Sequence, residues 1–166
     1  MVHKQRKLDK RRRREHKTNY TKRLILLKGK VPRLVVRKTN KYIILQIIES
    51  SHALDKVVYT VNTKELLKHG WPEANQGSLK SIPASYLGGL LLGKKAKELK
   101  QEIILDSGLI PNTQGSRVYA VIKGLADSGL KIKFNEKVIP SEEKIRGENT
   151  KIKDIFEKVK GEIEKQ

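Results

Sequence analysis

Positive charge is concentrated at the front of the chain, and this limits which residues can build a folded core. Residues 1–41 contain 17 lysines and arginines but only two acids, Asp9 and Glu15, a net charge of +15. The remaining 125 residues contain 20 basic and 16 acidic residues. A segment so rich in one charge repels itself and resists packing. The core must therefore come from later residues, and the front predicts a polyanionic partner, above all nucleic acid.

Composition argues against several other classes of protein. No apolar run approaches the roughly 20 residues that a membrane span requires, so we expect no membrane insertion. The absence of cysteine excludes disulfides and thiol ligands and fits a reducing compartment such as the cytoplasm. The arginine-rich front has the composition of a transit peptide, but it leads directly into a strand pattern. A nuclear-import reading of KRRRR would be compatible with RNA binding.

Hydrophobic periodicity predicts a meander of three antiparallel strands, at residues 33–37, 42–50 and 56–63. Asn40 and Lys41 stand between the first two strands as a two-residue hairpin turn. Both faces of the second strand are apolar, which indicates that both are covered. The strands therefore belong to a sheet with helices on its two faces rather than to a half-exposed sheet.

The rest of the pattern predicts a helix at 81–101, a buried parallel strand at 102–109 and a helix after Ser116. The order is β-β-β-α-β-α, an α/β fold with one mixed sheet and helices on both faces. Gly88, Gly89 and Gly93 in the first of these helices indicate a close approach, by the sheet or by a nucleic-acid backbone, and we favour the sheet.

Three regions follow from these predictions. Residues 1–30 form a basic N-terminal arm, irregular up to about residue 16 and helical from 18 to 28, with Thr18 or Asn19 as the cap. Residues 31–130 form the α/β domain. Residues 131–166 form a C-terminal arm that ends in an amphipathic helix over 151–164.

No recognisable catalytic or cofactor-binding motif occurs in the sequence. Histidines and carboxylates lack metal-ligand spacing, and we find no phosphate-binding glycine loop or nucleophile elbow, so we expect no metal, no cofactor and no enzymatic activity. One alternative is a nuclease with metal-binding acids at strand ends, for which Asp106 and Glu49 are the candidates. We instead expect Asp106 to cap the turn in LDSGL.

The basic front combines residue types that suit folded RNA. Arginine forms two parallel hydrogen bonds with phosphate and stacks on bases, tyrosine offers a stacking surface, and small polar groups reach the backbone or the 2′-hydroxyl. The first predicted hairpin adds further cations beside the arm. The predicted RNA-binding residues are Lys10, Arg11, Arg12, Arg13, Arg14, Lys17, Thr18, Asn19, Tyr20, Arg23, Arg33, Arg37, Lys38, Asn40 and Lys41.

Several blocks of the sequence then point to one family. RRRREHKTNYTKRLILLKGKVPRLVVRKTNKYIILQII, PASYLGGLLLGKKA, ILDSGL, GSRVYAVIKGLADSGL and PSEEKIRGE follow one another between residues 10 and 148. In this order they resemble the archaeal and eukaryotic branch of ribosomal large-subunit protein eighteen, which binds 5S ribosomal RNA.

This resemblance implies a ribonuclease-H-like shape without catalysis and a place in the cytoplasmic ribosome. It implies attachment of 5S rRNA to 23S rRNA in the central protuberance of the large subunit, among neighbouring ribosomal proteins. It also implies that the arginine run, the KTNY segment and the LVVRKTNK hairpin face RNA, with further contacts from Ser116, Arg117 and Arg146. The last helix lies beyond the usual end of the family and packs either on its own domain or on a neighbouring protein.

A second alternative is a peripheral membrane or chromatin-type protein that uses cationic attraction without selectivity. Such a protein would bind anionic vesicles, duplex DNA and folded RNA alike. The order of the sequence blocks favours an RNA-binding ribosomal protein over this alternative.

Overall fold

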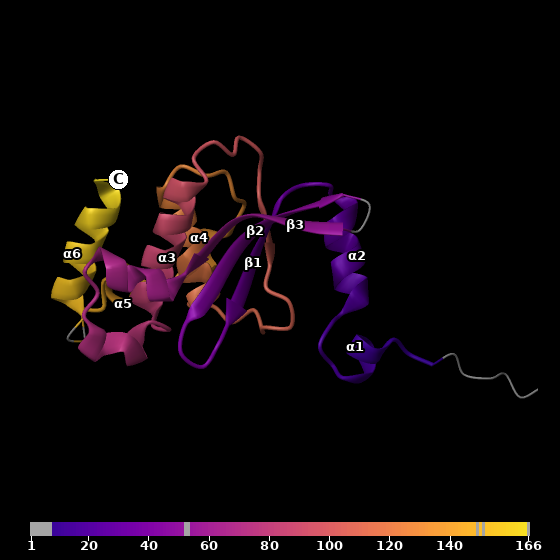
Figure 1. Cartoon of the computed structure of the whole chain (residues 1–166), viewed down its shortest axis with the longest axis horizontal. Coiled ribbons are helices and arrows are strands. Elements are labelled where there is room, and N and C mark those ends of the chain that lie inside the picture. Colours follow the sequence, from indigo (N-terminus) through magenta and orange to yellow (C-terminus); the bar gives the residue numbers. More distant parts are fainter. Residues whose placement is uncertain (1–7, 52–53, 149, 151, 166) are drawn as a thin grey trace, which may run out of the picture.

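The computed structural model of the chain describes residues 8–51, 54–148, 150 and 152–165. A four-stranded sheet with the order β3-β2-β1-β4 lies at its centre (Figure 1). The strands are β1 (Arg33–Lys38), β2 (Ile43–Ser51), β3 (Leu54–Asn62) and β4 (Ile104–Asp106). The α-helices are α1 (Arg11–Arg14), α2 (Tyr20–Lys28), α3 (Ile82–Lys95), α4 (Arg117–Asp127), α5 (Glu142–Arg146) and α6 (Lys153–Glu164). Within the described residues there are also three 3-10 helices, η1 (Thr63–His69), η2 (Glu73–Ser78) and η3 (Glu136–Val138).

The sheet is mixed, as the sequence predicts. β1, β2 and β3 form the antiparallel meander, and β4 lies parallel to β1. The turn between β1 and β2 is closed by Thr39, whose N–H donates to the Tyr42 carbonyl at 2.9 Å and whose hydroxyl oxygen accepts from Tyr42 N–H at 3.0 Å. Asn40 and Lys41 stand at its tip, so the two-residue hairpin is confirmed.

Strand alternation assigns the two faces of the sheet different roles. Leu34 and Val36 point to one face and belong to the core cluster that α3 completes. Arg33 points to the other face, on the same side as its parallel partner Ile104. A Cβ placed at Gly29, at the end of α2, would lie 3.9 Å from the Ile104 Cδ1 atom. The sheet therefore has α3 on one face and the end of α2 on the other, which confirms helices on both faces.

The tightest packing in the fold is between α3 and α4. A Cβ at Gly89 would lie 2.3 Å from the Val121 carbonyl oxygen, and one at Gly124 would lie 2.2 Å from the Tyr86 carbonyl oxygen. Gly88 instead faces the sheet, where a Cβ would meet Leu45 at 3.1 Å. The prediction that the sheet explains these glycines is thus right for Gly88 and wrong for Gly89 and Gly93, which make room for α4 and for Ser128 at its end.

Replacement of Gly89 by alanine is expected to destabilise the protein by about 1–3 kcal/mol or more, because the added methyl group overlaps backbone that cannot swing away. Gly161 in α6 is the matched control, since a Cβ there meets nothing within 4 Å. Gly161→Ala should stabilise by up to about 1 kcal/mol through helix propensity alone. Urea unfolding of both variants measures the difference, and equal effects would contradict this packing argument.

The C-terminal helix packs on its own domain. Phe156, Val159 and Ile163 are buried, and α6 lies against α3 and η1. The Phe156 ring lies 5.7 Å from the ring of Tyr86, whose hydroxyl donates to the Asp127 carboxylate at 2.8 Å. Burial and this carboxylate raise the pKa of Tyr86 well above its ordinary value. Of the two predicted docking sites for this helix, the structure shows the one on the chain itself.

Some boundaries differ from the sequence pattern. α3 ends at Lys95 and not near residue 101, because the chain turns back so that Ile103 N–H can donate to the Lys131 carbonyl at 2.9 Å. The loop after Gly70 contains a 3-10 helix, anchored by the buried Trp71 ring, whose Nε1 donates to the Asn75 carbonyl at 3.2 Å. Ser116 precedes α4 as predicted but makes no side-chain capping bond.

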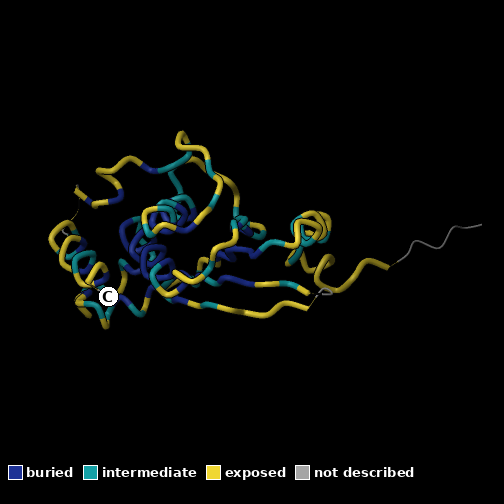
Figure 2. The backbone as a smooth tube through the Cα atoms, turned by 90° about the horizontal axis from the view of Figure 1, so that it is seen from above, coloured by how far each residue is buried: buried dark blue, intermediate teal, exposed yellow. Residues whose placement is uncertain are grey.

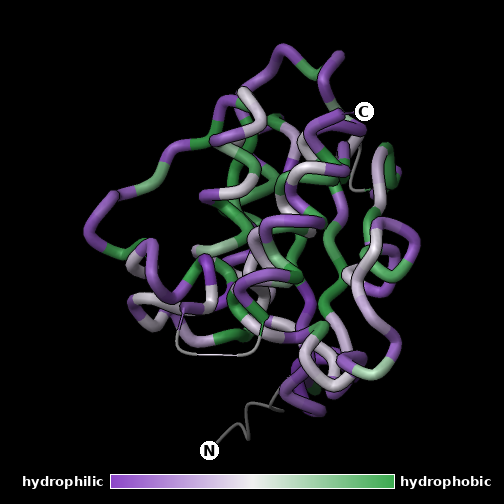
Figure 3. Tube along the Cα trace, turned by 90° about the vertical axis from the view of Figure 1, so that its left-hand side faces the viewer, coloured by the Kyte–Doolittle hydropathy of each residue, from purple (hydrophilic) through white to green (hydrophobic). Residues whose placement is uncertain are grey.

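Burial and hydropathy divide the molecule in the same way. Buried residues gather around α3 and the adjoining strands, while α1 and α2 at the opposite end contain none (Figure 2). Hydrophobic segments lie toward the interior and hydrophilic ones toward the outside (Figure 3). Among the described helices, none has the length and apolarity needed to cross a bilayer.

Candidate nucleic-acid interface

The arginine run forms one helical turn, α1, where the sequence predicts irregular chain. Asp9 lies 3.6 Å from Arg13 and Glu15 lies 3.7 Å from Arg11, so each acid pairs with a base one turn away. These i, i+4 pairs are the local reason that a run of like charges becomes helical. All four arginine side chains remain exposed and available to a polyanion.

Residues just after this turn hold the arm against α2. Arg12 Nε donates to the Thr18 hydroxyl at 2.8 Å, and Lys10 Nζ lies 4.9 Å from the centre of the Tyr20 ring. Asn19 is the predicted helix cap, since its Oδ1 accepts from Lys22 N–H at 3.0 Å. Thr18 and Asn19 therefore shape the arm, and this gives both a role besides any RNA contact.

A groove of about 500 Å³ lies between the start of α2, the end of β1 and the loop over 106–111. Its lining brings together cations from separate segments of the chain and contains Asp106 as its one acid among the described residues. The contributing cations are Arg12, Lys17, Lys22, Arg23, Arg37 and Lys38. Together with Thr18 and Asn19, seven of the predicted RNA-binding residues line this one groove.

Lys22 and the loop over 106–111 belong to this groove but were not predicted. Lys22 Nζ donates to the Ser107 hydroxyl and to the Gly108 carbonyl, both at 3.2 Å. Gly108 adopts a φ of +61°, which lets the loop turn back under Arg37. The one available signal in the sequence is the position of Lys22 in the first turn of α2, three residues after the cap.

Arg33 has a structural role, and its predicted RNA contact is wrong. Its side chain is 2% exposed, and its guanidinium donates to Asp106 at 2.9 Å and to Asp55 at 2.8 Å. It also donates to the Ser50 hydroxyl at 2.9 Å. A buried charge needs partners of this kind, and they leave Arg33 out of reach of any ligand.

Asp55 connects this buried arginine to α2. Its second oxygen accepts from Arg23 Nη2 at 2.7 Å, so one carboxylate joins the β2–β3 hairpin to the basic helix. Partial burial on its own would raise the pKa of Asp55, but hydrogen bonds from Ser50 and Arg23 and the charge of Arg33 outweigh it and hold the pKa below its ordinary value. Asp55 thereby links α2 to the sheet through Arg23.

The Arg37 side chain contacts Asp106 but remains partly exposed to solvent. Its Nη1 donates to the Asp106 carbonyl at 3.0 Å, its Nη2 lies 3.5 Å from the Asp106 carboxylate, and its side chain is still 44% exposed. The Asp106 carboxylate also accepts from Gly108 N–H at 2.9 Å, so the predicted turn cap is confirmed.

The other predicted residues do not all converge on the groove. Asn40 and Lys41 line a separate hollow beside η1 and η2, and Arg146 is exposed and paired with Glu142 at 3.3 Å. Ser116 and Arg117 line a third cavity, which Lys38 also reaches. The basic surface is therefore wider than a single groove.

The geometry argues against the nuclease alternative. The Asp106 carboxylate is held by Arg33 and Arg37, which disfavours the binding of a metal cation there. Glu49 lies on the opposite face of the sheet, because its neighbour Ile48 pairs with Arg33. Among the described residues no three acids or histidines are grouped closely enough to hold a metal ion.

Comparison with known proteins identifies the family. Residues 4–102 match the family of ribosomal large subunit proteins 60S L5 and 50S L18. The chain belongs to the uL18 family. It is 45% identical over 159 residues to large ribosomal subunit protein uL18 of Korarchaeum cryptofilum, covering 94% of this chain and 78% of that protein. It is 42% identical over 155 residues to uL18 of Methanoregula boonei, covering 90% and 87% respectively.

Membership of the uL18 family confirms the predicted resemblance and gives the chain a structural role in the large ribosomal subunit. These relatives are ribosomal proteins and not enzymes, which agrees with the prediction of a non-enzymatic chain. The matched segment includes α1, α2 and the antiparallel meander, so most of the groove lies inside it.

Proposed function

We propose that this uL18-family chain binds 5S rRNA and attaches it to 23S rRNA in the central protuberance of the large subunit. The observation that supports this most is the groove, where six cations from the arm, α2 and β1 meet around a single acid. Lysines and arginines spaced in this way neutralise several phosphates of one folded polyanion. The choice of 5S rRNA rests on the similarity of the sequence blocks over 10–148 to the family known to bind it.

The exposed basic side chains define the proposed phosphate contacts. Exposed arginines of α1 supply the outer charge, and the groove supplies a second row nearer the sheet. The proposed RNA-binding set keeps every predicted residue except the buried Arg33 and adds Lys22. Neighbouring large-subunit proteins are the remaining proposed partners.

Copurification tests the proposal. The full chain, expressed in archaeal cells and washed at high salt, should retain 5S rRNA in preference to other RNA. If about ten phosphates are neutralised, log affinity should fall with log salt at a slope of about −7 to −9. Comparable binding to anionic vesicles, duplex DNA and 5S rRNA at moderate salt would instead favour the unselective cationic protein.

Lys38→Ala tests whether the groove is part of this contact. Lys38 is exposed, lines the groove and forms no ion pair with any described residue, so its loss should remove one phosphate contact and reduce the salt slope by about 1. Lys97→Ala is the matched control, because Lys97 is an exposed lysine beyond α3 and outside the groove. Equal slopes for the two variants would exclude Lys38 from the interface.

A further inference from the structure

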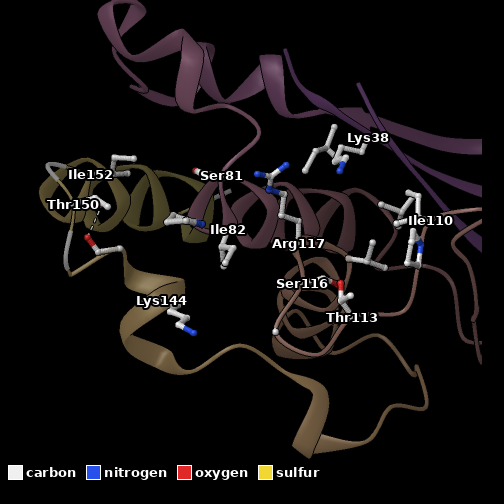
Figure 4. A pocket seen from close by; sticks show the side chains of 17 residues that line it. Lys38, Ser81, Ile82, Ile110, Thr113, Ser116, Arg117, Lys144, Thr150 and Ile152 are labelled. Atoms are coloured by element: carbon white, nitrogen blue, oxygen red, sulfur yellow. Dashed lines mark hydrogen bonds between the residues drawn. The ribbon is translucent and has the colours of Figure 1, made fainter. Parts of the chain in front are cut away.

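A second cavity, of about 700 Å³, lies between the starts of α3 and α4, the end of β1 and α5 (Figure 4). Ile43, Ile82 and Val118 are among the apolar residues that line it. Its cations are Lys38, Arg117 and Lys144, and its described lining contains no acid. The cavity therefore combines an apolar lining with a positive rim, and its volume is in the range of small-ligand sites.

This cavity continues the basic groove. Lys38, Ile110 and Pro111 line both hollows, so the end of β1 and the loop after β4 form their common wall. A strand of RNA held in the groove would therefore lie next to the mouth of the cavity.

One polar group in the cavity has no partner. Ser116 Oγ is buried and has no hydrogen bond to any described residue, and it does not cap α4. A buried hydroxyl without a partner is unfavourable unless a ligand supplies one. Beside it, Arg117 rises from the start of α4 and projects between Ser81 and Lys38 (Figure 4).

We propose that the cavity receives one unstacked nucleotide of the bound RNA, an inference that rests on the proposed function. The base lies on the apolar lining and against the Arg117 guanidinium plane, as unpaired bases do in RNA-binding proteins. Lys38 and Lys144 neutralise the flanking phosphates, and Ser116 Oγ, once its side chain turns toward the cavity, bonds with the base edge or the 2′-hydroxyl. The positive rim without an acid favours this occupant over the apolar side chain of a neighbouring protein.

Nucleotide-resolution chemical probing of 5S rRNA, bound to saturating full-length chain, tests this inference. Thr113 is exposed at the mouth of the cavity, so Thr113→Trp should close it without disturbing the core. The variant should lose the change in reactivity at one or two unpaired nucleotides, keep the rest of the footprint and bind roughly tenfold more weakly. Thr60→Trp, at an exposed position on the edge strand β3, is the matched control and should change neither result.

A second pair of variants distinguishes a contact made in the cavity from a general effect of positive charge. Arg117→Gln should affect the same nucleotides as Thr113→Trp, whereas Lys123→Gln, farther along α4 and outside the cavity, should not. A footprint of Thr113→Trp identical to that of the wild type would overturn the nucleotide cavity and leave 5S binding intact. Absence of any footprint on 5S rRNA would overturn the proposed function and this inference together.

Discussion

A chain that lacks residues 1–17 is expected to bind 5S rRNA roughly a thousandfold more weakly near 0.1 M salt and almost as well near 1 M. The deletion removes nine lysines and arginines. If about half of them contact phosphate, the salt slope should fall to about half of the wild-type value, because each contact releases a counterion. The difference in affinity therefore shrinks as salt rises. Binding isotherms at four or five salt concentrations measure both quantities.

The deletion should leave the domain folded, because α1 contains no buried residue. The contacts that would be lost, Arg12 with Thr18 and Lys10 with Tyr20, lie outside the hydrophobic core. A full-length variant with Arg11–Arg14 replaced by glutamine separates the effect of charge from that of chain length. Its salt slope should fall by the amount that the loss of about four phosphate contacts predicts. Unchanged affinity and slope in the truncated chain would show that the arm has no part in binding.

Arg33→Leu is expected to lower the free energy of unfolding by about 3 kcal/mol, or the melting temperature by roughly 10 °C. The change leaves the 7%-exposed Asp106 without its closest cation and also removes a partner of Asp55. The loss falls at the low end for buried pairs, because Arg37 and Gly108 N–H still contact the Asp106 carboxylate. Thermal and urea unfolding measure it directly.

Two further variants keep this prediction testable. Arg23→Leu removes the other arginine at Asp55, but its side chain is 38% exposed and its loss should cost less than about 1 kcal/mol. Arg33→Leu combined with Asp106→Leu should be clearly more stable than the sum of the single losses predicts, since no buried charge is left unpaired. Additive losses, or equal costs for Arg23 and Arg33, would contradict the claim that the cost arises from leaving a buried charge unpaired.

The sheet could be predicted from the sequence because alternation is a local signal. β1 and β2 match the predicted strands within one residue at each end, and the short turn at Asn40 and Lys41 sets their register. The parallel placement of β4 followed from the intervening helix. The helical turn at Arg11–Arg14 was missed because composition alone suggested repulsion, whereas pairs with Asp9 and Glu15 offset it.

The functional surface was less accessible to sequence reasoning. Arg33 and Arg37 lie on the same face of β1 and are equivalent in the sequence pattern, yet only Arg33 is buried. Its acidic partners lie 22 and 73 residues away in the chain, so no local pattern reveals them. Lys22 was missed for the same reason, since its contacts at Ser107 and Gly108 come from the loop after β4. The exposed charge of the arm needs no such long-range knowledge and was predicted.

The placement of α6 has a practical consequence. It is fastened to α3 at the end of the molecule opposite α1 and α2 (Figure 1), and Lys94 donates to the Glu164 carbonyl at 2.8 Å. The end of α6 thus lies far from the basic groove. A fluorescent reporter or affinity handle attached there would follow ribosome assembly without blocking the basic groove.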